Sequence, residues 1–259
     1  MSKKFIDLLK ILRLYELAKI INSQLIKLNP SFRSHQHEML KFYSQFISKG
    51  DKCFDVGANM GNRTDIFLEL GASVMVVEPQ QACYSFLEKK YKKNPKVKII
   101  KEALGAKKGK AKMMISNAST LSSLSKEWVN KVKNSGRFVD NTWDKTTTVK
   151  LTTLDDLITK YGKPVFCKID VEGFELQVLK GLSKSIKFLS FEFTPEYINS
   201  TVSCINHLSA IGDYKYNYSL GESMNLVSLE WMDNKEIREK LVPLSDDVAI
   251  FGDVYAKRV

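Results

Sequence analysis

The chain has 259 residues, of which 44% are hydrophobic and 27% are charged, and its formal net charge is +11. This composition is ordinary for a globular protein, and the length is sufficient to bury a full core. The four cysteines lack the spacing of a zinc site or of a disulfide framework. Because we recognise no signal peptide and no apolar run that could span a bilayer, we expect a reducing, cytoplasmic location.

The positive charge is spread along the chain. A charge of this size suggests an anionic partner, such as nucleic acid, a membrane surface or an anionic glycan. However, the lysines occur in short runs, for example within 89–93 and 107–110, and no stretch is rich in arginine or interleaved with aromatic residues. This pattern favours a solvated lysine-rich surface and makes a nucleic-acid partner improbable.

Residues 1–49 are predicted to form a helical extension. Over 3–28, apolar residues recur at helical spacing between lysines and arginines, and Asn29-Pro30 ends the pattern. The charges exclude a membrane-spanning helix. We expect the apolar stripe to pack on the main domain or on a second subunit, as in a homodimer. Peripheral contact with an anionic membrane is the alternative. A second helix is predicted over 34–49.

Residues 50–259 are predicted to form one α/β domain. Strand-like and helix-like segments alternate, which indicates a mostly parallel sheet with helices on both faces. The predicted strands of this alternation are 52–57, 73–78, 96–101, 165–169 and 188–193. Three further strands, expected to pair in antiparallel fashion, are 214–220, 225–230 and 248–256.

An insertion over about 106–150 interrupts the alternation. Residues 111–115 and 146–151 read as two paired strands, separated by a polar stretch and a helical segment. An insertion after the third strand would lie over the carboxyl edge of the sheet, where ligands bind in doubly wound folds. We therefore expect a flap that carries part of the substrate specificity.

A nucleoside pocket is predicted where the strand at 52–57 breaks into Gly57-Ala58-Asn59-Met60-Gly61. About 20 residues later the next strand ends in Glu78, at the position where an acidic residue binds ribose hydroxyls. Asn59 replaces a glycine of the dinucleotide fingerprint, and Asp55 would repel a pyrophosphate. The pattern suits a ligand with an ammonium and a sulfonium group, such as S-adenosylmethionine, and disfavours a nicotinamide oxidoreductase.

Acidic residues follow the ends of two neighbouring predicted strands. Asp170, Glu172 and Glu175 follow the strand at 165–169, and Glu192 lies near the end of the strand at 188–193. Because both strand ends face one crevice, we expect Asp170 and Glu192 to lie close together. Such a cluster can provide a general base, a substrate clamp or metal ligands. The alternative is favourable charge at a helix start together with an ion pair to Lys168.

Four stretches resemble the FkbM family of S-adenosylmethionine-dependent methyltransferases. They are Asp55-Val56-Gly57-Ala58-Asn59-Met60-Gly61, Thr153-Leu154-Asp155, Lys168-Ile169-Asp170-Val171-Glu172-Gly173-Phe174-Glu175 and Gly252-Asp253-Val254-Tyr255. The resemblance covers about residues 35–259, and the stretch from Lys168 is the specific part. It implies a Rossmann-like methyltransferase fold with a seven-stranded sheet and a reversed final strand. Relatives often carry a histidine shortly after the acid that matches Glu192, whereas Phe193-Thr194 follows here.

The resemblance also assigns roles to residues. Those expected to bind S-adenosylmethionine, and its product S-adenosylhomocysteine, are Asp55, Gly57, Asn59 and Gly61 for the methionine part, Glu78 for the ribose hydroxyls, and Glu102 and Ala103 beside the adenine, together with Ala58 and Pro79. Asp170 and Glu172 are expected to face the transferred methyl group and the acceptor. Asp170 is the first candidate for the catalytic base, followed by Glu172 and Glu192. Mg²⁺ held by Asp170 and Glu192 is chemically reasonable but not favoured, so no metal is assigned.

Together these expectations describe an O-methyltransferase. The acceptor would be a hydroxyl of a small molecule or glycan, with a sugar, nucleotide-sugar or polysaccharide favoured. An RNA ribose O-methyltransferase and a noncatalytic S-adenosylmethionine-binding module are the alternatives. Base N-methylation is disfavoured, because the sequence reads Asp-Val-Glu-Gly where those enzymes carry Asn/Asp-Pro-Pro-aromatic.

Overall fold

The structure, a computed structural model, describes residues 30–259, with side chains described from Ser34 on. The helix predicted over 3–28, with its proposed contacts, lies outside the described residues. None of the helices within 30–259 combines the length and the apolar character that crossing a bilayer requires.

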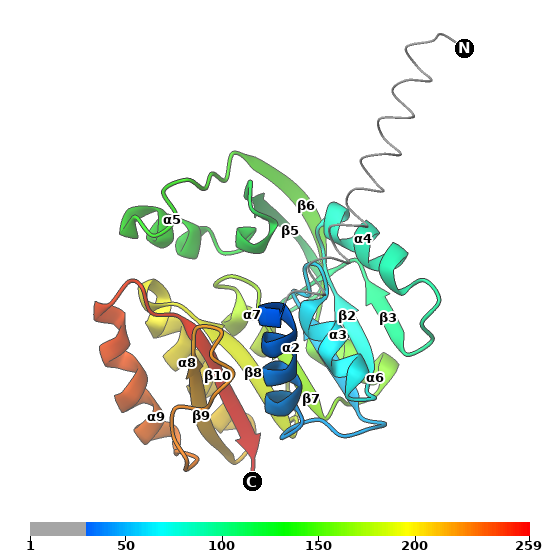
Figure 1. The fold of residues 1–259 in the computed structure, drawn as a ribbon. Helices are drawn as coiled ribbons and strands as arrows, with labels where there is room; N and C mark the ends of the chain where they lie inside the picture. Colours follow the sequence, from blue (N-terminus) through cyan, green and yellow to red (C-terminus); the bar gives the residue numbers. More distant parts are fainter. Residues whose placement is uncertain (1–29) are drawn as a thin grey trace.

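A seven-stranded sheet forms the centre of the fold (Figure 1), in the order β3-β2-β1-β7-β8-β10-β9. Its strands, in that order, are Val97–Ile100, Ser73–Val77, Lys52–Val56, Phe166–Ile169, Phe188–Phe193, Gly252–Arg258 and Tyr214–Leu220. The pairs from β3 to β8 are parallel, and β10 runs antiparallel to both of its neighbours. The predicted Rossmann-like sheet with a reversed final strand is confirmed.

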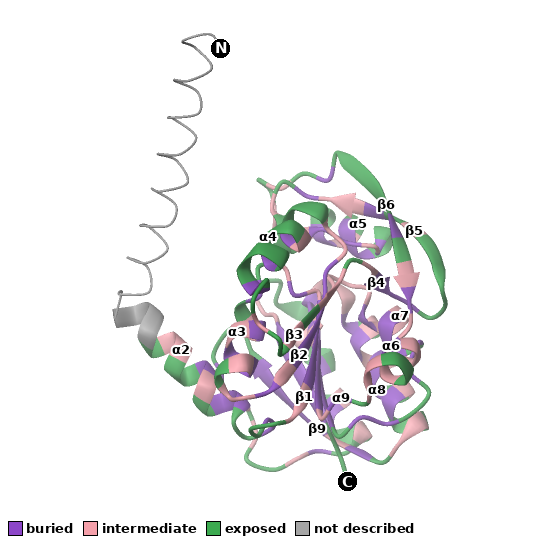
Figure 2. Cartoon of the chain, turned by 90° about the vertical axis from the view of Figure 1, so that its right-hand side faces the viewer, coloured by how far each residue is buried: buried purple, intermediate pink, exposed green. Residues whose placement is uncertain are grey.

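Helices cover both faces of this sheet, as predicted (Figure 2). Side chains of α2, α3 and α4 pack on one face, and those of α6, α7, α8 and α9 pack on the other. The helices are α2 (Pro30–Tyr43), α3 (Asn62–Glu69), α4 (Gln81–Tyr91), α6 (Leu154–Tyr161), α7 (Glu175–Leu179), α8 (Ile198–Ile211) and α9 (Asn234–Leu241), with short 3₁₀ turns at Pro195–Tyr197 and Val242–Asp246. Strands β1, β2, β7 and β8 lie between these layers and are almost wholly buried, as their apolar runs predict, whereas the edge strand β3 is partly exposed.

The second predicted helix is displaced. It spans Pro30–Tyr43, whereas the sequence analysis placed it at 34–49. Proline suits the first turn of a helix, because its missing N–H needs no partner there. After Tyr43 the chain turns, and Phe46 stacks on Phe166 and on Tyr255 of the sheet. The residues just before the first strand therefore belong to the core of the main domain.

The C-terminal region differs from the prediction in three elements, one of which is the strand predicted at 248–256, observed as β10 over Gly252–Arg258. The strand predicted at 225–230 is a loop, because the Asn217 side chain binds the Ser228 and Glu230 carbonyls where a strand would offer its backbone. Helix α9 was not predicted. It begins at a capping box in which Asp233 and Glu236 bind each other's backbone N–H groups. That Asp-x-x-Glu signal is readable in the sequence.

The insertion forms its own layer above the carboxyl edge of the main sheet (Figure 1). It contains β4 (Ala103–Leu104), β5 (Gly109–Ile115), a 3₁₀ turn η1 (Ser119–Leu121), α5 (Lys126–Ser135) and β6 (Lys145–Thr152). β5 and β6 pair in antiparallel register, as predicted. Trp128 of α5 is 0% exposed. It lies so close to Gly173 that any side chain at position 173 would overlap the Trp128 ring. The insertion is thus packed against the loop that follows β7.

Candidate active site

The glycine turn after β1 forms one wall of a cavity. Gly57 has a φ of 81°, and a Cβ on it would lie 1.7 Å from the backbone oxygen of Asp170. Only glycine permits the two strand ends to come so close. Asn59, with a φ of 50°, continues the turn, and Gly61 precedes the first residue of α3. The turn therefore brings the ends of β1 and β7 together at the cavity.

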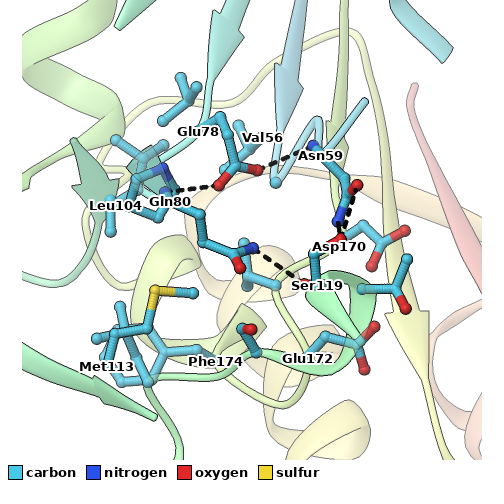
Figure 3. A pocket seen from close by; sticks show the side chains of 18 of the residues that line it. Val56, Asn59, Glu78, Gln80, Leu104, Met113, Ser119, Asp170, Glu172 and Phe174 are labelled. Carbon is cyan, nitrogen blue, oxygen red and sulfur yellow. Dashed lines mark hydrogen bonds between the residues drawn. The ribbon is translucent and has the colours of Figure 1, made fainter. Parts of the chain in front are cut away.

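Glu78, at the end of β2, is held by the same turn (Figure 3). Its two carboxylate oxygens accept hydrogen bonds from the backbone N–H of Asn59 at 2.9 Å and of Gln80 at 2.7 Å. Burial raises the pKa of Glu78 to about 7, although both N–H groups act to lower it. The orientation of this side chain is thus fixed before any ligand binds.

Eight of the predicted cofactor and catalytic positions line this cavity. They are Gly57, Asn59, Glu78, Pro79, Ala103, Asp170, Glu172 and Glu192. The cavity encloses about 220 Å³. Apolar side chains of Leu104, Met113 and Phe174 complete it, and none of these was predicted. The result is a mixed pocket with one polar and one apolar end.

Four other predicted cofactor positions lie outside the cavity lining. Asp55 is 2% exposed and accepts a hydrogen bond of 2.5 Å from Thr64, so it braces the turn from behind. Ala58 and Gly61 belong to the turn without lining the cavity, and Glu102 lines a separate surface hollow beside Lys110. Contact of these four residues with the cofactor stays a prediction.

The insertion contacts the glycine turn after β1 and the residues that follow β2 (Figure 3). The Asn59 side-chain amide donates to the Ser119 hydroxyl at 3.2 Å, and the Gln80 side chain donates to the Ser119 carbonyl oxygen at 3.0 Å. Ser119 lies in η1, some sixty residues from Asn59. No local sequence signal announces such a contact. The 3₁₀ turn therefore closes one side of the cavity.

A carboxyl cluster occupies the end of the cavity nearest β7 and β8. Asp170, Glu172 and Glu192 each place one carboxylate oxygen within 4.8 Å of the others. Burial, together with the charges of Asp170 and Glu175, raises the pKa of both Glu172 and Glu192 well above the ordinary value, and the Lys168 charge acts in the opposite direction. The expected proximity of Asp170 and Glu192 is found. Carboxylate oxygens suit Mg²⁺, but the Lys168 ammonium already provides a positive charge 2.9 Å from Asp170, and we assign no metal.

Glu175 has a different place from its neighbours in the sequence. It is 5% exposed, and its carboxylate accepts hydrogen bonds from the backbone N–H groups of Val171 and Gly173. Burial raises its pKa to about 7. The side chain shapes the loop that carries Asp170 and Glu172, and it does not line the main cavity.

Glu222 lines the cavity from the loop after β9 and was not predicted. The Arg63 guanidinium of α3 binds its carboxylate. The two residues are 159 positions apart, so only the folded chain reveals the pair. No lysine, arginine or histidine is among the described residues that line the cavity, which is therefore strongly acidic.

The FkbM methyltransferase domain model matches residues 55–241. Similar solved structures include a precorrin-6Y C5,15-methyltransferase from Geobacter metallireducens, with 9% identity, 86% of this chain and 87% of that chain covered, and a TM-score of 0.46. An O-methyltransferase from Bacillus cereus has 9% identity and a TM-score of 0.43, with 89% of this chain and 82% of that chain covered. Fibrillarin from Aeropyrum pernix has 8% identity and a TM-score of 0.40, with 82% of this chain and 68% of that chain covered. No curated protein matches the chain. Because the family model covers most of it, the chain belongs to the FkbM family of S-adenosylmethionine-dependent methyltransferases.

Proposed function

We propose that this methyltransferase transfers a methyl group to a hydroxyl of a sugar or other polyhydroxylated acceptor, with Asp170 as general base. The observation that carries the proposal is the position of Asp170. Its carboxylate lines the cavity beside the glycine turn and contacts a buried ammonium group. A hydroxyl acceptor must lose its proton, and a positioned carboxylate contributes typically about 10²–10⁴-fold to such a reaction.

The polar and apolar ends of the cavity suggest how the cofactor would lie. Glu78 would accept hydrogen bonds from the ribose hydroxyls, and Asn59 would lie beside the methionine part. Leu104 and Met113 offer apolar surface that suits an adenine ring. This placement would direct the reactive end of the cofactor towards Asp170.

S-adenosylmethionine, when bound, supplies a methyl carbon that its sulfonium group has already activated. The task of the protein is therefore to orient the acceptor oxygen and to remove its proton. In the proposed step, the Asp170 carboxylate would take the hydroxyl proton of the acceptor, and the cofactor would supply the methyl group that replaces this proton on the oxygen. The products are a methyl ether and S-adenosylhomocysteine.

Two features favour Asp170 over its acidic neighbours as the base. A base must be deprotonated at the working pH, and burial, which raises the pKa of Glu172 and of Glu192 well above the ordinary value, works against the deprotonated form of both. Asp170 instead contacts the Lys168 ammonium directly. The carboxyl groups of Glu172 and Glu192 line the cavity and can form hydrogen bonds with acceptor hydroxyls, which suits a polyol.

The charge of the cavity bears on the acceptor class. Its lining contains five carboxyl side chains, those of Glu78, Asp170, Glu172, Glu192 and Glu222. Phosphates close to the reacting centre would be repelled there, since no basic side chain of the described residues lines the cavity. An uncharged sugar hydroxyl therefore suits the site better than the ribose of RNA.

The test is methyl transfer from labelled S-adenosylmethionine to a panel of sugars, polysaccharides and RNA. We expect the wild type to methylate a sugar hydroxyl. Asp170→Asn should bind S-adenosylhomocysteine within about threefold of the wild type but lose at least about 100-fold in turnover. Asp144→Asn, which changes an exposed carboxyl group in the insertion, is the matched control. Methylation of RNA alone would refute the acceptor class, and full turnover by Asp170→Asn would refute the base.

A further inference from the structure

Lys168 is a buried cation beneath the active site. It lies in β7, the central strand of the sheet, and is 3% exposed. Its ammonium nitrogen lies 2.9 Å from an Asp170 carboxylate oxygen and 3.4 Å from one of Asp253. Asp253, on β10, is itself only 7% exposed. The lysine thus joins a carboxylate that lines the cavity to one that is buried behind it.

Core stability alone does not account for a lysine at this position. Removing an ammonium group from water is costly, and buried ion pairs can often be replaced by apolar residues without loss of stability. The other residues of β7, Phe166, Cys167 and Ile169, are 0% exposed and apolar. Strands buried on both faces normally carry such side chains throughout. The charge of Lys168 therefore points to a role in the neighbouring site.

The strand register places Lys168 directly below the carboxyl cluster. Lys168 is opposite Ser190 on β8, and Asp253 is opposite Glu192, two residues further along β8. Residues two apart in a strand share a face of the sheet. The side chains of Lys168, Glu192 and Asp253 consequently project to the same side. The Ser190 hydroxyl, also on this face, has no hydrogen-bond partner among the described residues.

We propose that Lys168, anchored by Asp253, is a positioning residue that holds the Asp170 carboxylate at the cavity wall and balances the charge of Glu172 and Glu192. The inference rests on the function proposed above, in which Asp170 takes the acceptor proton. Burial and the charges of Asp170 and Glu175 raise the pKa of both glutamates, and Glu172 adds to the rise at Glu192. The positive charge of Lys168 lowers the pKa of both, and Arg137 acts in the same direction on Glu172. Lys168 thereby acts on all three members of the cluster without lining the cavity.

Two substitutions in the same buried pair separate this role from a purely structural one. Lys168→Met removes a positive charge and Asp253→Asn a negative charge, each at similar side-chain volume. The full chain, labelled with ¹³C at the glutamate carboxyl carbons, is titrated by NMR, and Glu172→Gln and Glu192→Gln assign the two signals. We expect Lys168→Met to raise the titration midpoints of both glutamates by about one pH unit, and Asp253→Asn to lower them. Midpoints that stay in place, or move in one direction in both variants, would overturn the proposal.

Binding and turnover complete the test. S-adenosylhomocysteine should bind Lys168→Met within about threefold of the wild type, which shows that the fold and the cofactor pocket persist. With a sugar acceptor from the panel, kcat should fall at least about tenfold at unchanged KM, and an unchanged kcat would contradict the role. If Lys168→Met does not fold, the Asp253→Asn titration decides alone. Because the titrations need no acceptor, they give an answer even if no sugar is methylated, which separates failure of this inference from failure of the proposed function.

Discussion

Glu78 should make the binding of the cofactor depend on pH. Burial raises its pKa to about 7, and a ribose hydroxyl donates a hydrogen bond most strongly to the ionised carboxylate. With that pKa, about nine-tenths of the carboxyl groups are ionised near pH 8 and about one-tenth near pH 6. If the ionised form alone binds, the affinity for S-adenosylhomocysteine falls nearly tenfold, by about 1.3 kcal/mol, as the pH decreases across this interval.

Calorimetric titration in buffers of different ionisation enthalpy measures both the affinity and the protons released. We expect the release of about 0.9 proton near pH 6 and about 0.1 proton near pH 8. Glu78→Gln cannot ionise, so it should bind more weakly and with little dependence on pH. Glu175→Gln is the control, because Glu175 also has a pKa raised to about 7 but lies outside the cavity lining. A wild-type affinity that is constant over this range, or a dependence that survives in Glu78→Gln, would refute the reasoning.

Three further substitutions test the construction of the site and of the insertion above it. Gly57→Ala would place a Cβ 1.7 Å from the Asp170 carbonyl oxygen, so we expect loss of S-adenosylhomocysteine binding in calorimetry. Gly136 also has a positive φ, but no heavy atom lies within 4 Å of the added Cβ. Gly136→Ala should therefore retain S-adenosylhomocysteine binding and lower the free energy of unfolding by about 1 kcal/mol. Trp128→Ala removes a side chain that is 0% exposed and should lower the free energy of unfolding by about 3–5 kcal/mol, as measured in urea. Wild-type binding by Gly57→Ala, or a loss below about 1 kcal/mol for Trp128→Ala, would show that these contacts are misjudged.

Much of the fold can be predicted from the sequence, because local patterns report local structure. The apolar runs that end in Asp55, Glu78 and Asp170 each mark one parallel strand, and all lie in the central sheet. Their order follows from the resemblance to a known family. The meeting of Asp170 and Glu192 could also be foreseen, since the carboxyl ends of neighbouring parallel strands share one edge.

The prediction failed where side-chain contacts override local preference. Residues 225–230 have the composition of a strand, but the Asn217 side chain binds two of the loop's carbonyl groups. The turn after Tyr43 lets Phe46 reach the core, which shortens the predicted helix. Neither effect can be read from the segment itself, because each depends on a partner elsewhere in the chain.

The sequence by itself determined the fold class, the family and the edge of the sheet at which the candidate site lies. Only the tertiary structure decided which acids face the cavity, because Asp55 and Glu175 follow the same sequence patterns as Glu78 and Asp170 but lie outside the cavity lining. It alone joined Lys168 to Asp253 across 85 residues. The charge on a carboxyl group, and hence its chemistry, depends on its neighbours in space, and packing chooses those neighbours from the whole chain.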